Sequence, residues 1–359
     1  MEQKPDESLW GWGIRRTIRD ERGEPCRPLR SVLVFRRSKV KVGVLLNNFG
    51  GFPETGLGAR ACIDLARQAE RLGFDSVWVT DHVVLPRERR TPYPHNDSGG
   101  FPYTWEQEIF EPLTLMAALA TATERVEIGV SVLVIPYRHP LLTAKMIATA
   151  DQLSGGRIVL GAGVGWLREE FEALGLPAEH YERRGAVTMD YLRAMQVSWT
   201  AGAGASHEGE FVRFEDLGTR PLPARQPHPP VWLGGQGERA LRRTVELGQG
   251  YLAISSNPES LNRDTDRLHA LCDEASRDFA TLEIAHIDGL ILAPEVASTE
   301  GATLVGPCDF LCGELERYSA AGLTHLVAGV SRAGDQRYES VVDALEEVAA
   351  GILPAARAL

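Results

Sequence analysis

The chain has 359 residues, 43% of them hydrophobic, which is enough to bury a full core as one large barrel or as two smaller domains. Its formal net charge of -11 at pH 7 argues against a general binder of nucleic acid or anionic membranes, because both would repel it, and favours a small-molecule partner. The five cysteines are scattered and include no CxxC pair, so we expect a reducing cytoplasm and neither a disulfide framework nor a zinc ribbon.

The N-terminal stretch Met1 to Lys39 fits no packed element. It mixes arginines with acidic residues and prolines, and only Val32 to Phe35 is apolar in sequence. It has no apolar segment of the kind that signal peptides carry, and Asp20 and Glu21 among the arginines weigh against a transit peptide. We therefore expect residues 1–39 to be a disordered extension or the product of an upstream translation start, followed by one folded domain over residues 40–359.

Strands and helices alternate regularly from Val40 onward. Short β-branched and apolar runs predict strands, and apolar residues at helical spacing predict the helices between them. The predicted strands cover residues 39–46, 76–80, 126–135, 158–160, 231–235, 251–255, 282–292 and 324–330. The predicted helices cover residues 58–73, 109–123, 141–153, 167–199, 238–247, 258–277, 309–321 and 338–356.

This alternation of strands and helices predicts the fold class α/β and, within it, a (β/α)8 TIM barrel with insertion loops. A doubly wound sheet would usually have fewer strands and a phosphate fingerprint on its first turn. The first turn here, NNFGGFPETGLG, is interrupted by proline and ends in no GxGxxG. The barrel is therefore the predicted architecture.

In such barrels the chemistry lies on the loops that follow the strands. Three of these loops are long: Val84 to Glu108, Trp166 to His180 and Ala293 to Cys308. Aromatic residues in the first two suggest a broad apolar or ring-containing ligand, although each could equally pack within its loop: Tyr93, Phe101, Tyr103, Trp105 and Trp166. Thr200 to Pro230 precedes a strand, so we expect it mainly on the opposite rim, with a short hairpin at EGEFVRFEDL.

Polar residues at the end of the second predicted strand are the first candidates for catalysis. Asp81 and His82 could orient and proton-couple a reacting cofactor. An aspartate that caps the turn beside a satisfied histidine explains the same residues equally well. The remaining histidines form no HExxH or HxH, so no metal site is expected.

Two glycine-rich turns are candidates for binding. GAGVGW, after the fourth strand, lets the backbone approach a flat ligand closely, but glycines that ease packing at a strand end would look the same. In LGGQGERALRR, Gly234, Gly235 and Gly237 precede a helix whose first-turn amides would face an anion. The alternative there is an ordinary glycine-rich turn.

Three stretches carry a resemblance to a known family: GFDSVWVTDHVVLP (Gly73 to Pro86), the segment from VEIGVSVLVIP to EALG (Val126 to Gly175), and PPVWLGGQGERALRRTVELGQGYL (Pro229 to Leu252). They resemble the bacterial luciferase-like family, and specifically its deazaflavin-dependent oxidoreductase branch. The match runs in order from about Val40 to Leu359. It implies a (β/α)8 barrel that holds coenzyme F420 or FMN at the C-terminal ends of the strands.

The resemblance also implies roles for single residues. Asp81 and His82 match the pair beside the reacting ring, and Ser131–Val132 matches a non-prolyl cis peptide that supports the back of the ring. The loop that lines the cofactor and its phosphate-binding turn match Gly163, Val164, Gly165 and Trp166, and Gly234, Gly235, Gln236 and Gly237, respectively. Glu169 joins the cofactor-binding set and, with Asp81, is the next proton source after His82.

The activity that the resemblance implies is hydride transfer between coenzyme F420 and a small organic substrate, with His82 as proton partner. An FMN-dependent monooxygenase using molecular oxygen is the alternative enzyme, and a non-catalytic flavin-binding barrel is the alternative of another class. Family members that act on sugar phosphates hold the phosphate with lysines in the later half of the barrel. No lysine follows Lys145, so a sugar phosphate is not expected. Neither nucleic acid nor a membrane is an expected partner, and a homodimer is left open.

Overall fold

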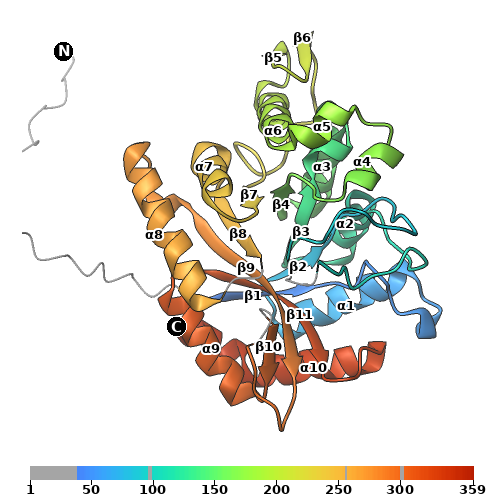
Figure 1. The fold of residues 1–359 in the computed structure, drawn as a ribbon, viewed down its shortest axis with the longest axis vertical. Helices are drawn as coiled ribbons and strands as arrows, with labels where there is room; N and C mark the ends of the chain where they lie inside the picture. Colours follow the sequence, from blue (N-terminus) through green and yellow to red (C-terminus); the bar gives the residue numbers. More distant parts are fainter. Residues whose placement is uncertain (1–38, 96–98, 255–256, 300–302) are drawn as a thin grey trace, which may run out of the picture. The chain divides into compact units, whose positions relative to one another are not determined.

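The computed structural model of the chain describes residues 39–359, apart from 96–98, 255–256 and 300–302. The predicted N-terminal extension, except for Lys39, lies outside the described residues. From Lys39 onward the described residues form one compact unit, a barrel of parallel strands surrounded by helices (Figure 1). The predicted (β/α)8 fold is confirmed.

Eight parallel strands of the described chain close into the barrel, because the last of them pairs with the first and Val42 lies opposite Leu326. Going round the ring, they are β1 (Lys41–Leu45), β2 (Ser76–Val79), β3 (Glu127–Val134), β4 (Ile158–Gly163), β7 (Val231–Gly234), β8 (Gly250–Ile254), β9 (Glu283–Leu292) and β11 (His325–Arg332). All their carboxyl ends therefore lie at one rim, which we call the C-terminal rim.

Helices cover the outside of this barrel. They are α1 (Ala59–Leu72), α2 (Pro112–Ala122), α3 (Pro140–Ser154), α6 (Arg184–Ala201), α7 (Glu238–Leu247), α8 (Pro258–Glu274), α9 (Cys308–Ala320) and α10 (Tyr338–Gly351). Gly73 and Gly155 end α1 and α3 in the left-handed conformation that glycine adopts without strain. No helix in the described part of the chain combines the length and the apolar character that crossing a membrane requires.

Three segments differ from the prediction. The predicted helix over residues 167–199 is three helices, α4 (Arg168–Ala173), α5 (Ala178–Glu182) and α6, with Gly175 and Pro177 between the first two. The loop after β9 contains a further strand, β10 (Thr303–Gly306), which pairs with β9 outside the closed ring. The last predicted helix ends at Gly351, and Leu353–Ala358 forms a separate α11. Single-turn helices are η1 (Pro53–Thr55), η2 (Ile135–Tyr137) and η3 (Phe279–Thr281).

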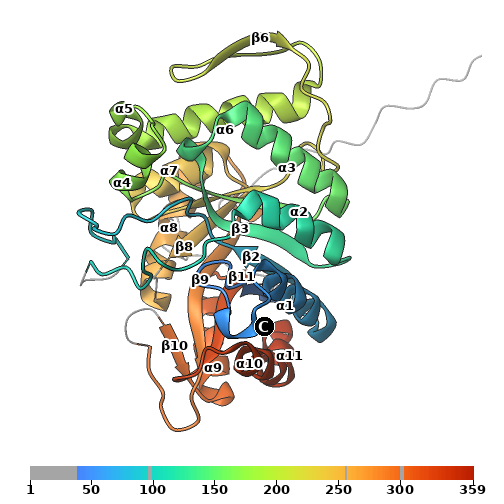
Figure 2. The same cartoon turned by 90° about the vertical axis from the view of Figure 1, so that its right-hand side faces the viewer.

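The predicted hairpin is present and consists of β5 (Ala205–Glu208) and β6 (Arg213–Leu217), which lie beyond α6 in Figure 2. Asp190 of α6 holds it, since the carboxylate accepts hydrogen bonds from His207 Nε2 at 2.7 Å and from the Phe211 amide at 2.7 Å. The proline-rich stretch that follows contacts the end of α3, where Gln152 donates to the Leu222 carbonyl. Because α3 leads into the start of β4, this stretch lies at the rim opposite the C-terminal one, as expected.

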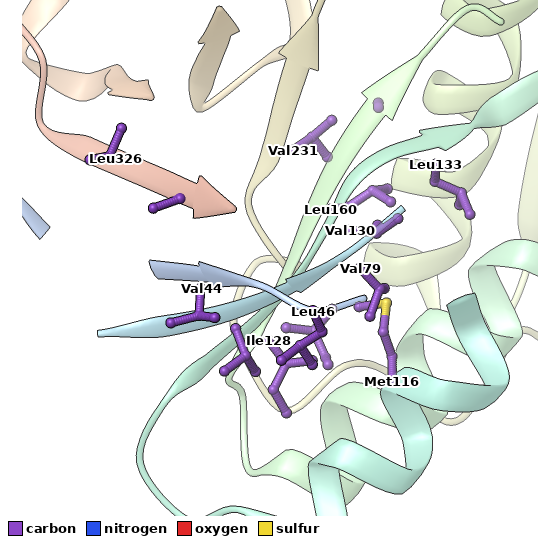
Figure 3. Close-up of a cluster of buried hydrophobic side chains, with 14 of the residues drawn as sticks. Val44, Leu46, Val79, Met116, Ile128, Val130, Leu133, Leu160, Val231 and Leu326 are labelled. Atoms are coloured by element: carbon purple, nitrogen blue, oxygen red, sulfur yellow. The ribbon is translucent and has the colours of Figure 1, made fainter. Parts of the chain in front are cut away.

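The core has two layers. Between strands and helices, apolar side chains such as Val79 of β2 and Met116 of α2 pack together (Figure 3). Inside the barrel a second layer consists of Trp78, Val159, Trp232, Leu252, Ala285 and Val327. A Cβ on Gly129 would lie 2.1 Å from the Trp78 ring, so this ring fills the barrel only because β3 offers a glycine there.

We predict that His325, inside the barrel, makes stability depend on pH. Burial, and then the charge of Lys41, lowers its pKa to about 3. Below about pH 6.5 His325 binds a proton in the unfolded chain but not in the folded barrel. The free energy of unfolding is therefore highest above that pH and falls as the pH drops towards 3. Between pH 6.5 and pH 5 the loss should be about 2 kcal/mol, at about 1.4 kcal/mol per pH unit. Urea unfolding of the wild type and of His325→Asn at both pH values measures it; equal pH dependence in the two proteins would contradict the prediction.

Candidate active site

Asp81 follows β2 at the C-terminal rim and is fully engaged. Its carboxylate forms a two-point ion pair with Arg138, with both nitrogen–oxygen distances 2.8 Å, and accepts the Val134 amide at 2.9 Å. Arg138 also reaches Glu111 at 3.0 Å. Because the contacts of Asp81 with Val134 and Arg138 hold the end of β2 against the end of β3, Asp81 fixes the geometry of the rim and is poorly placed to exchange a proton.

His82 is the next residue, and its side chain is 11% exposed. Its Nδ1 lies 2.8 Å from Oε2 of Glu170, a buried residue of α4. The same Oε2 accepts a hydrogen bond from the Tyr137 hydroxyl at 2.8 Å. The imidazole therefore has one nitrogen held by a carboxylate.

Aromatic side chains surround the His82 ring. Its centroid lies 5.5 Å from that of Phe49, 5.3 Å from Phe101 and 6.1 Å from Trp166. Tyr93 and Tyr103 extend the group by packing on Trp166 and Phe49, respectively. We call these five the aromatic cluster. The aromatic residues of the predicted loops thus gather above His82, apart from Trp105, which is exposed.

Glu169 lies on the other side of α4 and anchors the loop after β2. Its carboxylate accepts hydrogen bonds from the amides of Arg90 at 2.5 Å and Thr91 at 3.1 Å, and from the Thr91 hydroxyl at 2.7 Å. Burial raises the pKa of Glu169, but these hydrogen bonds outweigh it and bring the value to about 2. The structure therefore places the carboxylate of this predicted cofactor-binding residue against the loop, and its role toward a cofactor stays a prediction.

We expect Glu169→Gln to loosen this loop. At pH 7 the neutral amide loses charge-assisted hydrogen bonds, so trypsin should cut at Arg87–Arg90 roughly tenfold faster than in the wild type. Because the pKa is lowered in the folded state, the stabilisation is present above about pH 4.5 and is lost as pH falls through about 2, so the difference in Tm should shrink over that range. Glu172→Gln is the matched control, since its exposed ion pair with Arg90 should contribute little. Equal digestion of all three proteins would refute the anchor.

The peptide bond between Ser131 and Val132 is cis, as the resemblance implies. The Val132 side chain nests against two predicted glycines, because a Cβ on Gly163 or Gly234 would lie 2.3 Å or 2.6 Å from its methyl groups. With Leu45 and Ile287, Val132 lies partly exposed on the inner core layer. These three side chains form an apolar floor at the C-terminal rim.

A group of arginines lies beside the second glycine turn. A Cβ on Gly235 would lie 3.8 Å from a guanidinium nitrogen of Arg243, and burial, then the charges of Arg239 and Arg184, lowers the pKa of Arg243. The Nε atoms of Arg184 and Arg243 are buried without a hydrogen-bond partner, and none of the three arginines has a carboxylate partner in the described part of the chain. Arg184 does donate from Nη1 to the Tyr181 carbonyl at 2.9 Å. We call Arg184, Arg239 and Arg243 the arginine cluster. Next to it α7 begins at Glu238 without a side-chain cap, so its first amides also face outward.

Comparison with known proteins now decides the family. Residues 40–300, more than half of the chain, match the model of the luciferase-like monooxygenases. The chain belongs to the luciferase-like monooxygenase family. The resemblance seen in the sequence is thereby confirmed.

The names of curated relatives of this chain give different cofactors. An FMNH2-dependent dimethylsulfone monooxygenase of Pseudomonas putida is 30% identical over 48% of this chain and 50% of its own length. An F420-dependent glucose-6-phosphate dehydrogenase of Amycolatopsis mediterranei is 29% identical over 58% and 57%. An uncharacterized protein of Mycobacterium tuberculosis is 35% identical over 52% and 65%. The chain thus spans one half to two thirds of the length of these relatives.

A solved structure supports the luciferase-like barrel. An F420-dependent secondary alcohol dehydrogenase in complex with an F420-acetone adduct superposes with a TM-score of 0.71, over 89% of this chain and 99% of that one. The identity is 18%, so this likeness concerns the fold alone.

The predicted residues of this luciferase-like chain form two groups at the C-terminal rim. One group holds Asp81, His82, Trp166 and the glycines that contact Val132. The other is the turn between β7 and α7, where Gln236 donates to the Ile254 carbonyl at 2.8 Å. In the described chain no three His, Cys, Asp or Glu side chains are grouped as metal ligands would be.

Several residues at both places were not predicted: Glu170, Arg138, Tyr137, Phe49, Arg184, Arg239 and Arg243. One of them had a signal in the sequence. Arg138 follows β3 as Asp81 follows β2, so both belong at the same rim, where opposite charges would pair.

Proposed function

We propose that this protein is an oxidoreductase that transfers a hydride between coenzyme F420 and a small organic substrate at the C-terminal rim. The observation that carries the proposal is His82, held by Glu170, at the same rim as the apolar floor around Val132. The name of the F420-dependent relative supports the choice of cofactor. When bound, the deazaflavin accepts or gives the hydride, and the protein supplies orientation and electrostatics.

The residues present fit such a cofactor. The apolar floor of Leu45, Val132 and Ile287 suits one face of a flat ring. Gly163 and Gly234 leave room for the Val132 side chain in this floor, because a Cβ at either position would clash with its methyl groups. The arginine cluster and the start of α7 offer unpaired positive charge for a phosphate, which an acidic protein must provide locally. The glycine turn predicted to bind phosphate thus has cationic side chains beside it.

The chain's own residues have distinct tasks in this proposal. His82 takes or gives the proton that accompanies hydride transfer. Asp81 and Arg138 hold the rim in shape, and the aromatic cluster excludes water from the space above His82. The arginine cluster binds the phosphate end of the cofactor and thereby fixes the position of the cofactor ring relative to His82.

The substrate that suits this site is apolar or ring-containing and uncharged. The aromatic cluster offers flat apolar surface above His82. Arg89, which lies over the Phe101 ring, donates to the carbonyls of Phe101 and Tyr103, and Arg138 is paired with Asp81 and Glu111. The site therefore favours a neutral substrate over a sugar phosphate, in agreement with the lack of lysine after Lys145.

An FMN-dependent monooxygenase is the second candidate, and the name of the Pseudomonas putida relative favours it. Titration of the purified protein with each oxidised cofactor, read by fluorescence quenching, distinguishes the two. We expect saturable quenching of F420 at micromolar concentration and weaker binding of FMN. Binding of FMN without binding of F420 would instead support the FMN-dependent monooxygenase. If the protein binds either cofactor but shows no turnover with the reduced cofactor, it is the non-catalytic flavin-binding barrel.

We also propose a cytoplasmic location and a small molecule as the partner, without nucleic acid or membrane. The scattered cysteines and the net charge of -11 support these proposals. A homodimer stays a prediction, and the mass of the protein in solution would test it.

A further inference from the structure

The buried carboxylate of Glu170 has four hydrogen-bond partners. Its Oε1 accepts the amides of Val83 at 2.5 Å and Val84 at 3.2 Å. Its Oε2 faces the Tyr137 hydroxyl and His82 Nδ1, each at 2.8 Å. The side chain of Glu170 is 0% exposed, so no solvent competes for these oxygens.

Three of these partners can only donate. The two amides have no lone pair to offer, and Tyr137 keeps its proton because burial, followed by the charge of Glu170, raises its pKa. Three donors that converge on two oxygens match the hydrogen-bonding pattern of a carboxylate, which has no proton to give, so the fourth partner donates as well. The proton of the neutral His82 ring therefore lies on Nδ1.

We propose that Glu170 is a positioning residue that fixes the tautomer of His82, so that Nε2 is the nitrogen that exchanges the proton of the reaction. This inference rests on the proposed function, in which His82 is the proton partner. Nε2 has no hydrogen-bond partner in the described part of the chain, and the ring is held on its sides by Phe49, Phe101 and Trp166. A fixed tautomer presents a lone pair at Nε2 in the neutral ring and an N–H there in the charged one.

Other acidic groups near His82 are engaged elsewhere. Asp81 pairs with Arg138, and Glu169 holds Arg90 and Thr91 of the loop. The tyrosines of the aromatic cluster, Tyr93 and Tyr103, have a pKa raised by burial and stay neutral. Glu170 is therefore the described carboxylate that acts on the imidazole.

The substitution Glu170→Gln should reverse the tautomer. The two amides at the Oε1 position require an acceptor, so the oxygen of the glutamine must face Val83 and Val84. Its NH2 group then faces His82, and Nδ1 has to accept. The proton of the neutral ring moves to Nε2, which can no longer take up a proton. Tyr137→Phe is the matched control, because it removes one donor to the same oxygen and leaves the carboxylate in place.

The test is the ¹⁵N spectrum of the histidine ring nitrogens in the cofactor-free, ¹⁵N-histidine-labelled protein at about pH 8.5, where histidine is ordinarily neutral. The signals that vanish in His82→Ala belong to His82. We expect a protonated Nδ1 in the wild type and in Tyr137→Phe, and a protonated Nε2 in Glu170→Gln. In single turnover with F420, Glu170→Gln should be slower by roughly 10²–10⁴-fold, with cofactor affinity changed by less than about threefold.

Two results would overturn the proposal: a wild-type ring with its proton on Nε2, or a Glu170→Gln ring that keeps it on Nδ1. If Glu170→Gln does not fold, the spectra of the wild type and of Tyr137→Phe still decide. Because the spectra need no cofactor, failure of F420 to bind would contradict the proposed function alone and leave the tautomer result standing.

Discussion

His82→Ala should reduce the rate of hydride transfer by roughly 10²–10⁴-fold while changing cofactor affinity far less, because it removes the proposed proton-transfer group and few ligand contacts. His82 lies at the C-terminal rim with one nitrogen held by Glu170 and the other without a partner in the described chain. The measurements are the cofactor dissociation constant and the single-turnover rate of both proteins.

His82→Gln is the matched control for packing. Its amide can still donate to Glu170 and fills part of the ring's volume, but it cannot exchange a proton near neutral pH. The rate of His82→Gln should therefore be as low as that of His82→Ala. Normal turnover of either variant would show that His82 has a structural role. The proton would then have to come from a group other than Asp81, because Asp81 is held by Arg138.

Arg243→Glu should weaken cofactor binding by roughly 10²-fold or more, because it replaces a charged donor by a repelling carboxylate, and a charged hydrogen bond contributes about 1.5–3 kcal/mol. The cofactor-free protein should be as stable as the wild type or more so. In the wild type Arg243 is repelled by Arg184 and Arg239, and a glutamate there would pair with them. Dissociation constants and Tm values of the cofactor-free proteins measure both effects.

Arg242→Glu makes the same change of charge one residue earlier. Arg242 is exposed and pairs with Glu238 and Glu274 at the surface, so its replacement should affect cofactor binding little. Equal losses of affinity in both variants would indicate a general effect of net charge and contradict a specific anion site. If Arg243→Glu lowers the Tm of the cofactor-free protein and Arg242→Glu does not, Arg243 stabilises the fold and its proposed role in anion binding is not needed.

The fold could be predicted from the sequence because each strand and helix carries its own local signal. The β-branched run of β3, and the glycines that end α1 and α3, need no knowledge of distant residues. The errors occur where local signals are weak. β10 is four residues long and exists through its pairing with β9, and α4 and α5 are too short for helical periodicity to show their ends.

The candidate site was predictable only in part, for a related reason. Asp81, His82 and the glycine turns are marked by their place after strands, whereas their partners come from far along the chain: Arg138 is 57 residues from Asp81, and Glu170 is 88 residues from His82. Nothing local tells Glu169 from Glu170, and only the orientation of α4 sends one to the loop and the other to His82. The arginine cluster likewise forms through the approach of α6 and α7.

The way in which α4 holds its surroundings has a consequence for how this barrel can diversify. Glu169 and Glu170 bind the loop after β2 largely through main-chain amides, those of Arg90 and Thr91 and those of Val83 and Val84. Any residue except proline offers such an amide. The side chains of this loop that do not contact His82 are therefore free to change over evolution without detaching it, so the surface of the loop can vary by point substitutions while the contact between His82 and Glu170 is inherited intact.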